Sequence, residues 1–109
     1  ARGMLIMGWY LAGHADSVYG AFAPEVAEKI SVDGVREQRD VFEERVGIVL
    51  NVRVEKMTRR NGIAQFWWEA DGTNFTNEPV VMRWLLNEDL QVVGIGFTPK
   101  SRAPFDPEG

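Results

Sequence analysis

The spacing of hydrophobic residues changes once along the chain, at Gly47. Before this glycine, hydrophobic residues recur three and four positions apart, as on one face of a helix. This spacing predicts helices over 4–12, 17–22, 24–29 and 32–46. After Gly47, hydrophobic and polar residues alternate, as on the two faces of a strand. The alternation predicts strands over 48–57, 63–70, 79–86 and 91–97. Helices followed by a four-stranded meander indicate an α+β fold.

Glycine, proline and capping residues mark the ends of the predicted helices. Gly13 suits the left-handed position that ends the first helix, and Asp16 is expected to cap the second. Pro24 fits the first turn of the third helix, and Ser31 fits the N-cap of the fourth. The first helix is apolar nearly all round, which predicts a buried element. Gly8 in its middle lowers helix stability by about 1 kcal/mol relative to alanine. A glycine retained at that cost usually lets another group pack close to the helix, so we expect a close neighbour there.

The first hairpin has two possible registers. A two-residue turn would place apolar Val54 opposite charged Glu69. A three-residue loop, 60–62, pairs Val54 with Trp68 instead. It also pairs Arg53 with Glu69, so that every side chain reaches a suitable face. We predict the three-residue loop.

This register divides the predicted sheet into two faces. The face toward the helices carries Leu50, Val52, Val54, Phe66, Trp68, Met82, Trp84, Val93, Ile95 and Phe97. The outer face carries Asn51, Arg53, Glu55, Gln65, Trp67, Glu69, Val81, Arg83 and Leu85. Gly94 and Gly96 leave the last strand bare on that outer face. We expect an interface with a second copy or a neighbouring domain there, formed by Trp67, Val81, Arg83 and Leu85; the alternative is a tolerated apolar patch.

The length and composition fit one domain. With 109 residues, 45% of them hydrophobic, the chain is long enough for one core and too short for two. We expect residues 1–98 to form this domain. Residues 99–109 hold three prolines and no periodicity, which predicts a tail or linker. Because the chain begins at Ala1 without an initiator methionine, we interpret it as a fragment or a processed product.

Charge and residue usage argue against several classes of partner. Sixteen acidic and twelve basic residues give a net charge of −4, whereas nucleic-acid binding needs a basic face. No apolar run reaches the roughly 20 residues of a membrane span, and the first residues do not resemble a secretion signal. We therefore expect neither a nucleic-acid nor a membrane partner. The absence of cysteine excludes a disulfide framework but fits either redox compartment, so the localisation stays open.

The stretch GHADS, residues 13–17, holds the only histidine, His14, followed by Asp16 and Ser17. Nucleophilic triads use these residue types, but they take them from separate elements so that the base points at the nucleophile. Side chains two and three positions apart in one tight turn diverge. We therefore interpret GHADS as a turn between two helices.

The remaining charged residues show no metal or phosphate motif. One histidine, no cysteine and no carboxylates at ligand spacing argue against a metal, and we expect no cofactor. Glu55 and Glu69 fall on the outer sheet face, where Arg53 and Arg83 are expected to be their cross-strand partners. Such exposed pairs imply no function.

Two phrases of the sequence resemble the nuclear transport factor 2-like superfamily. LAGHADSVYGAFAPEV, residues 11–26, is similar to the segment that joins its first two helices. LNEDLQVVGIGFTP, residues 86–99, is similar to its closing hairpin. The resemblance covers residues 4–99 and implies N-terminal helices packed in the concave face of a curved antiparallel four-stranded meander. This cone fold encloses an apolar pocket. The pattern is most similar to small domains that precede serine hydrolase or β-lactamase-like domains.

The catalytic residues of the superfamily do not carry over to this chain. Ketosteroid isomerases have a pocket-facing tyrosine in the first helix, near the position of Ile6 here. Their aspartate base falls at Ile30 or its neighbours. The Asp-Arg-Asp relay of the epoxide hydrolases has no match, because the inward strand positions are almost wholly apolar.

Aromatic residues converge between the predicted helices and sheet. The candidate ligand-binding residues are Trp9, Tyr10, Tyr19, Gln38, Phe66, Trp68, Met82 and Trp84. Tyr10, Tyr19 and Gln38 would supply the few polar groups that such pockets use. Four tryptophans favour a pocket or an interface, because a buried indole needs a hydrogen-bond partner. A close-packed core without a pocket is the alternative.

We therefore expect a non-catalytic binding or accessory domain. Its apolar pocket would take a small hydrophobic ligand, or the domain would dock a neighbouring domain or dimerise. The alternative is a small isomerase, dehydratase or hydrolase of the same fold that acts on an apolar substrate. That enzyme needs an inward carboxylate. Asp40 and Glu43 are expected on the solvated side of the fourth helix, which leaves Glu44 as a weak candidate.

Overall fold

The computed structural model describes residues 2–102, except for the side chains of Arg2 and Arg60. The helices are α1 (Arg2–Leu11), α2 (Ala15–Gly20), α3 (Pro24–Ala27) and α4 (Val32–Val46). The strands are β1 (Val49–Arg60), β2 (Ile63–Gly72), β3 (Phe75–Leu86) and β4 (Val92–Pro99), followed by the 3₁₀ helix η1 (Lys100–Arg102). The α+β class and the division at Gly47 are confirmed.

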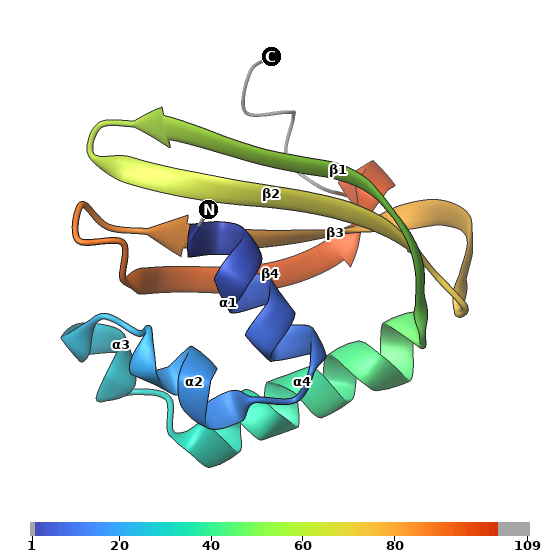
Figure 1. The fold of residues 1–109 in the computed structure, drawn as a ribbon. Coiled ribbons are helices and arrows are strands. Elements are labelled where there is room, and N and C mark those ends of the chain that lie inside the picture. Colours follow the sequence, from blue (N-terminus) through green and yellow to red (C-terminus); the bar gives the residue numbers. More distant parts are fainter. Residues whose placement is uncertain (1, 103–109) are drawn as a thin grey trace.

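The strands form one antiparallel sheet in the order β1-β2-β3-β4. Figure 1 shows a curved, open sheet with α1 lying across one face and α4 running below β4. Backbone hydrogen bonds tie the α2–α3 connection to β4, because Ala23 N–H donates to the Val92 carbonyl at 2.9 Å. Val92 N–H in turn donates to the Ala21 carbonyl at 2.7 Å. The helices therefore cover one face of the sheet and reach its β4 edge.

The structure confirms three of the four residues that were predicted to mark helix ends. Gly13 has a φ of +81°, Pro24 begins α3, and the Ser31 hydroxyl accepts a hydrogen bond from Gly34 N–H at 3.1 Å. Asp16 is not the cap of α2. His14 occupies the N-cap position without a side-chain capping bond, and Asp16 lies in the first turn, where a carboxylate is still favoured by the helix dipole.

Helix α1 is only half buried, which corrects two expectations. Met4 and Leu5 are 49% and 47% exposed, so the apolar sequence does not bury the whole helix surface. Nothing lies within 4 Å of the position that a side chain at Gly8 would take. The close approach occurs at Gly3, where a Cβ would come within 2.5 Å of the Phe66 ring. The glycine that brings α1 onto the sheet is therefore Gly3.

The first hairpin has the register that the sequence analysis rejected. Arg60 lies opposite Ile63, so the turn contains only Asn61 and Gly62. Both turn residues have positive φ, 54° and 81°, the conformation that two-residue hairpin turns favour. Val54 consequently lies opposite Glu69, and the predicted Val54–Trp68 pair is wrong.

Two bulges in β1 explain how the sheet tolerates this register. The pairing shifts between Val49 and Asn51 and again between Val52 and Val54. Each bulge adds one unpaired residue and reverses the alternation of faces. The predicted inward position of Val54 is therefore wrong, and Val52, although opposite inward Ala70, and Leu50 are 42% and 65% exposed rather than buried. Met57, opposite Phe66, packs against the core from this strand instead.

The inward residues of β2 and β3 are as predicted. Phe66, Trp68, Met82 and Trp84 are at most 2% exposed and belong to the core. In β4, Ile95 and Phe97 pack against this core. Val92 replaces the predicted Val93, because a bulge at the start of β4 places Val92 opposite Leu86.

The first part of the predicted tail is structured. Strand β4 continues to Pro99, and η1 follows directly. The Glu78 carboxylate of β3 accepts hydrogen bonds from Ser101 N–H at 2.6 Å and from the Ser101 hydroxyl at 3.1 Å. The rest of the predicted tail, 103–109, lies outside the described residues. Within residues 2–102, no helix is both long and apolar enough to cross a membrane.

Candidate functional site

The predicted aromatic pocket is filled by its own side chains in the middle of the sheet. Tyr10 packs edge-on against Trp84 and Phe42, with ring centroids 5.4 and 5.5 Å apart. Phe42 packs edge-on against Phe97 at 5.1 Å. The Trp84 indole N–H points at the Met7 sulfur, 3.1 Å away. Interlocked rings of this kind fill the space between α1, α4 and the sheet at this point.

The candidate residues divide between this core and its surroundings. Those buried in the core, at most 2% exposed, are Tyr10, Phe66, Trp68, Met82 and Trp84. Trp9 and Tyr19 are partly buried and pack against the core, and the Tyr19 hydroxyl donates to the Ala27 carbonyl at 3.2 Å. Gln38 alone of the predicted set lines the larger cavity described below. The ligand-binding role of the other seven stays a prediction.

Tyr10 connects the core to α4. Its hydroxyl donates to Gln38 Oε1, and Gln38 is partly buried on the α4 stripe where the sequence placed it. Burial raises the pKa of Tyr10 well above its ordinary value, and the neighbouring Arg39 charge offsets only part of this rise. Tyr10 is therefore a neutral hydroxyl that fixes the carbonyl end of the Gln38 amide.

A cavity of about 320 Å³ lies beside this pair, between the first turns of α4, the α3–α4 connection and β4. It is lined by Phe22, Lys29, Ile30, Ser31, Gly34, Val35, Gln38 and Ile95. The cap at Ser31 starts α4 at this point, and the backbone bonds between Ala23 and Val92 hold Phe22 beside β4. We refer to this space as the α4–β4 cavity.

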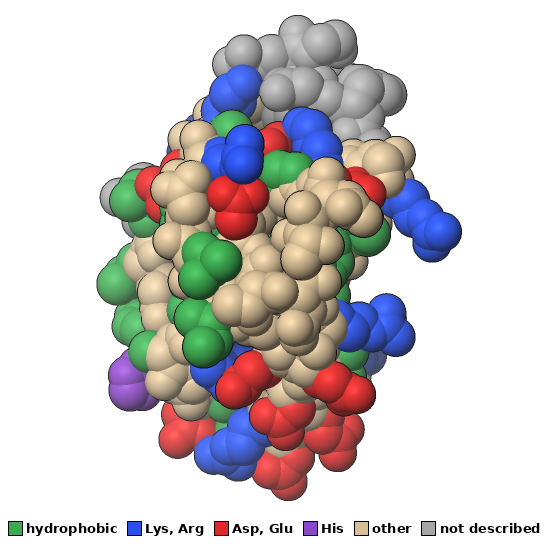
Figure 2. Space-filling view, turned by 90° about the vertical axis from the view of Figure 1, so that its right-hand side faces the viewer, with side chains coloured by type: hydrophobic (Ala, Val, Ile, Leu, Met, Phe, Trp, Pro, Cys, Tyr) green, Lys and Arg blue, Asp and Glu red, His purple; other side chains and the backbone are tan. Residues whose placement is uncertain are grey.

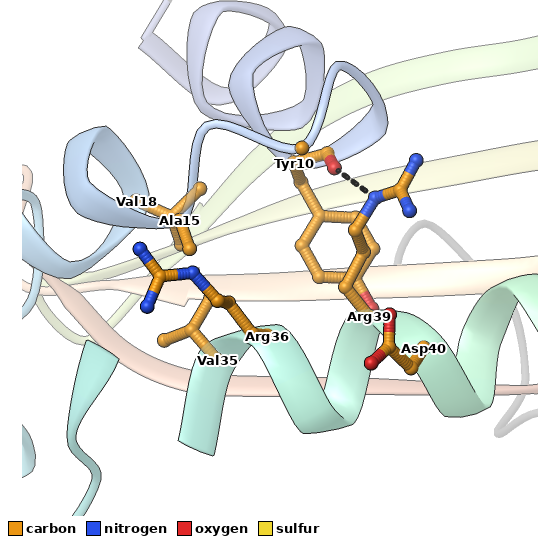
Figure 3. Close-up of a pocket in the computed structure, with 8 residues that line it drawn as sticks. Tyr10, Ala15, Val18, Val35, Arg36, Arg39 and Asp40 are labelled. Atoms are coloured by element: carbon orange, nitrogen blue, oxygen red, sulfur yellow. Dashed lines mark hydrogen bonds between the residues drawn. The ribbon is translucent and has the colours of Figure 1, made fainter. Parts of the chain in front are cut away.

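A smaller cavity of about 200 Å³ lies on the α1–α2 side of Val35 (Figure 3). Arg36, Arg39 and Asp40 surround it together with Tyr10 and the α2 residues Ala15 and Val18. Its arginines are engaged elsewhere in the structure. Arg36 pairs with Asp33 at 2.9 Å and Asp16 at 3.5 Å, so it forms exposed ion pairs.

Arg39 fastens α1 to α4. Its Nε donates to the Tyr10 carbonyl at 3.1 Å, and one terminal nitrogen donates to the Leu11 carbonyl at 2.9 Å. The other terminal nitrogen binds Glu43 at 2.5 Å. The last carbonyls of a helix lack partners within that helix and carry its negative dipole end. The guanidinium of Arg39 therefore has a structural role.

The residues of GHADS do not form a catalytic group. His14 and Asp16 are exposed and Ser17 is partly buried, and the Asp16 carboxylate contacts Arg36. His14 supplies backbone bonds to the turn, accepting from Val18 N–H at 3.1 Å and donating to the Trp9 carbonyl at 2.9 Å. The structure thus agrees with the interpretation of this stretch as a turn.

The acidic residues near the described cavities are exposed. Asp40 and Glu43 lie on the solvated side of α4, as predicted. Glu55 lies opposite Trp68, on the face of the helices and not on the predicted outer face, and lines a shallow hollow along β1. Glu44 is also exposed and lines neither of the two cavities described above, nor the hollow along β1, nor a further one between Leu11, Phe42 and Ile48. Its backbone carbonyl, rather than its carboxylate, accepts a bond from Asn74 at 3.1 Å. Its catalytic role stays a prediction.

The outer face of the sheet differs from the predicted open patch. Trp67 and Val81 are 0% exposed. The Lys100 ammonium lies 5.3 Å from the centre of the Trp67 ring, because η1 packs back onto the sheet. Leu85 covers Gly94, where a Cβ would come within 3.1 Å of its side chain. The interface predicted from Trp67, Val81, Arg83 and Leu85 therefore has no exposed tryptophan.

The predicted cross-strand ion pairs on the outer face are also different. Arg53 pairs with Asp71 at 2.9 Å, and Arg83 donates to Gln65 at 3.1 Å. Glu69, 6% exposed, accepts hydrogen bonds from the Trp67 indole at 2.8 Å and from Lys100. A buried carboxylate with two donors is a satisfied structural group on the face opposite the helices.

Comparisons of the chain with protein-family models, with curated proteins and with solved structures give no significant match. Among the described residues, no three histidine, cysteine, aspartate or glutamate side chains are grouped so that they could hold a metal ion.

Sequence reasoning missed several residues of the α4–β4 cavity. Lys29, Ile30 and Ser31 lie in the connection before α4, and Phe22 lies outside the helix that it was expected to end. The alternation of residues in β4 was the one feature of the sequence that pointed to this cavity, because it placed Ile95 on the face toward the helices. The size of a cavity, however, depends on which neighbouring side chains fail to fill it.

Proposed function

We propose that the chain is a non-catalytic binding domain that takes a small hydrophobic molecule in the α4–β4 cavity. The finer description as a cone of the nuclear transport factor 2-like superfamily is part of this proposal. The observation that carries it is a 320 Å³ cavity between helices and a sheet edge. Ligand pockets usually have volumes of roughly 300–1,000 Å³, so this one suits a small ligand.

The lining of the cavity supports the same proposal. Phe22, Ile30, Val35 and Ile95 offer hydrocarbon surfaces, which release water when an apolar ligand covers them. Gln38 adds a polar group whose orientation is fixed by Tyr10. A mainly apolar wall with one fixed polar group is typical of small-molecule sites.

The proposal is tested by titrating the protein with 1-octanol and following its tryptophan fluorescence. Trp84 lies opposite Ile95 in the sheet, so it is the tryptophan placed to report on the cavity wall. We expect saturable binding in the wild type and a loss of at least about tenfold in affinity for Ile95→Phe, which fills the cavity.

Ile63→Phe is the matched control, because it makes the same change at a residue that is 39% exposed and far along the sheet. It is expected to bind octanol as the wild type does. Equal weakening by both variants, or no saturable binding to the wild type, contradicts the proposal.

A docking role is the second candidate, and exposed apolar residues around β1 favour it. Ile48 and Leu50 are 71% and 65% exposed, and Figure 2, which faces this end of the molecule, shows hydrophobic side chains grouped above a charged border. The test is sedimentation: docking of a second copy through this surface predicts a dimer that Leu50→Glu converts to a monomer. An unchanged mass removes this candidate.

The enzyme alternative has the weaker support. A general base works best when partial desolvation raises its pKa toward neutrality. Glu44 is exposed, and the acidic residues that border the described cavities are exposed as well. Octanol binding without turnover of an apolar ester, epoxide or enone supports the binding domain.

A further inference from the structure

We propose that the ligand of the α4–β4 cavity is a small apolar carboxylic acid, with its carboxylate at Lys29 and its hydrocarbon part against Ile30, Val35 and Ile95. This inference rests on the proposed function and adds the chemical class of the ligand. It is based on the polar groups that line the cavity and on their positions along α4.

The polar side chains at the cavity are hydrogen-bond donors. The Ser31 hydroxyl oxygen already accepts from Gly34 N–H at 3.1 Å, so its own O–H is left to donate. Gln38 Oε1 already accepts from the Tyr10 hydroxyl, which leaves the amide Nε2. Lys29 contributes an ammonium group, which has donors and no acceptor. Lys29 and Ser31 lie two residues apart at one end of the cavity, so a ligand group that binds both must present acceptor oxygens.

The charge at the cavity is positive and is not neutralised by the described residues. Lys29 lines the cavity and forms no ion pair within residues 2–102. Glu28 directly precedes Lys29 in the sequence but does not line the cavity, and Asp33 on α4 is bound to Arg36 at 2.9 Å. No aspartate or glutamate lines the cavity in the described part of the chain. An anionic ligand is therefore favoured over a neutral or cationic one of the same shape.

The positions of these groups define the direction and length of the ligand. Lys29 and Ser31 lie at the start of α4, and Gln38 follows Ser31 by seven residues. At a rise of 1.5 Å per residue, this separation is about 10 Å along the helix axis. Val35 lies between the two ends, and Ile95 faces it from β4. Octanoate, whose extended chain is of comparable length, is a suitable probe.

The experiment is a thermodynamic cycle in which the ligand headgroup and residue 29 of the protein are changed separately and together. Calorimetric affinities of octanoate and 1-octanol are measured for the wild type and for Lys29→Gln. We expect Lys29→Gln to weaken octanoate by about two- to fivefold, the usual effect of an exposed ion pair, and to weaken octanol by less than it weakens octanoate. Raising the salt concentration should weaken octanoate binding in the wild type and have less effect in the variant, because ions screen exposed charges.

Arg45→Gln is the matched control, because it removes one positive charge from an exposed position of α4 that lines none of the described cavities. It should leave both affinities unchanged. If octanol binds and Lys29→Gln does not alter octanoate binding, or alters it no more than Arg45→Gln does, the carboxylate inference is wrong while the proposed function stands. If neither probe binds the wild type, both proposals fail.

Discussion

The two halves of α4 pack against the sheet in different ways. Toward its C-terminal end, Phe42 interlocks with Tyr10 and Phe97, and Val46 is completely buried. Toward its N-terminal end, Val35 faces a cavity of about 320 Å³. Flat rings packed edge to face fill the space at one end. The other end has branched aliphatic side chains, Ile30, Val35 and Ile95, which leave space between helix and strand.

This difference separates stability from binding within one helix. Protein interiors are normally packed as densely as organic crystals, and large voids are few in a domain. The tightly packed end of α4 therefore holds the fold together, and the loosely packed end is where we propose that a ligand binds. Substitutions at the two ends should have different effects, and four predictions test this contrast.

The largest effect is expected from Trp84→Ala. Trp84 is 0% exposed and contacts Tyr10 and Met7, so its removal leaves a large hole that the neighbouring rings cannot fill. We expect a loss of about 3–5 kcal/mol in the free energy of unfolding, measured by urea denaturation. Trp84→Phe, which keeps a ring, should lose much less. A loss below about 1 kcal/mol for the alanine variant would mean that this region is not tightly packed.

Adding volume in the packed core and beside the α4–β4 cavity gives the next contrast. Val80 is 0% exposed in the core, so Val80→Phe should cost about 1–3 kcal/mol through overpacking. Ile95→Phe puts a larger ring beside the α4–β4 cavity and should change the free energy of unfolding by less than about 0.5 kcal/mol. Thermal unfolding of both variants measures the difference. Equal destabilisation by the two would show that no usable space exists beside Ile95.

Arg39→Ala tests the fastening of α1 to α4. It removes two hydrogen bonds to the last carbonyls of α1, at Tyr10 and Leu11. We expect a loss of about 1–2 kcal/mol in chemical denaturation, because these acceptors are partly buried. Arg36→Ala on the same helix is the control. The ion pairs of Arg36 are exposed, so the free energy of unfolding of Arg36→Ala should stay within about 0.5 kcal/mol of the wild type. A larger loss for Arg36→Ala than for Arg39→Ala would contradict the structural role assigned to Arg39.

Tyr10→Phe is expected to have a smaller effect than Arg39→Ala, since it removes only the hydroxyl that holds Gln38. The loss should be about 1 kcal/mol near neutral pH. Burial raises the folded-state pKa of Tyr10, so its contribution to stability is fully present below about pH 10 and is lost as the pH rises further. Raising the pH from about 9 to about 11 should therefore lower the free energy of unfolding more in the wild type than in Tyr10→Phe, as measured by chemical denaturation at each pH. Identical pH profiles would contradict this.

The sequence predicted the parts of the fold that depend on local patterns. The spacing of Val35, Phe42 and Val46 defined α4, and the alternation around Phe66 and Trp84 defined the inward face of the central strands. Both patterns are set by residues within one element, so they can be recognised without knowing what lies opposite.

The errors arose where one element compensates for another. The two-residue turn at Asn61 and Gly62 was rejected because it placed Val54 opposite Glu69, but bulges at Leu50 and Arg53 restore the faces further along β1. No residue type in β1 identifies a bulge, because the extra residue is defined only by its pairing with β2.

The candidate site was predicted only in part for a similar reason. Gln38 was found because a polar residue on an apolar stripe is visible in the sequence. The aromatic residues expected to line a pocket interlock instead, and the outer-face Trp67 lies beneath Lys100. Whether side chains enclose a cavity or fill it depends on their packing in three dimensions, which neither composition nor periodicity specifies.

The most direct test of the α4–β4 cavity is an NMR titration of the isoleucine methyl groups with 1-octanol. The five isoleucines are Ile6, Ile30, Ile48, Ile63 and Ile95. Binding in the cavity predicts saturable shifts of the Ile30 and Ile95 methyls, with the core residue Ile6 and the exposed residues Ile48 and Ile63 nearly unchanged. Shifts confined to Ile48 and Ile63, or uniform shifts without saturation, would contradict a binding site between α4 and β4.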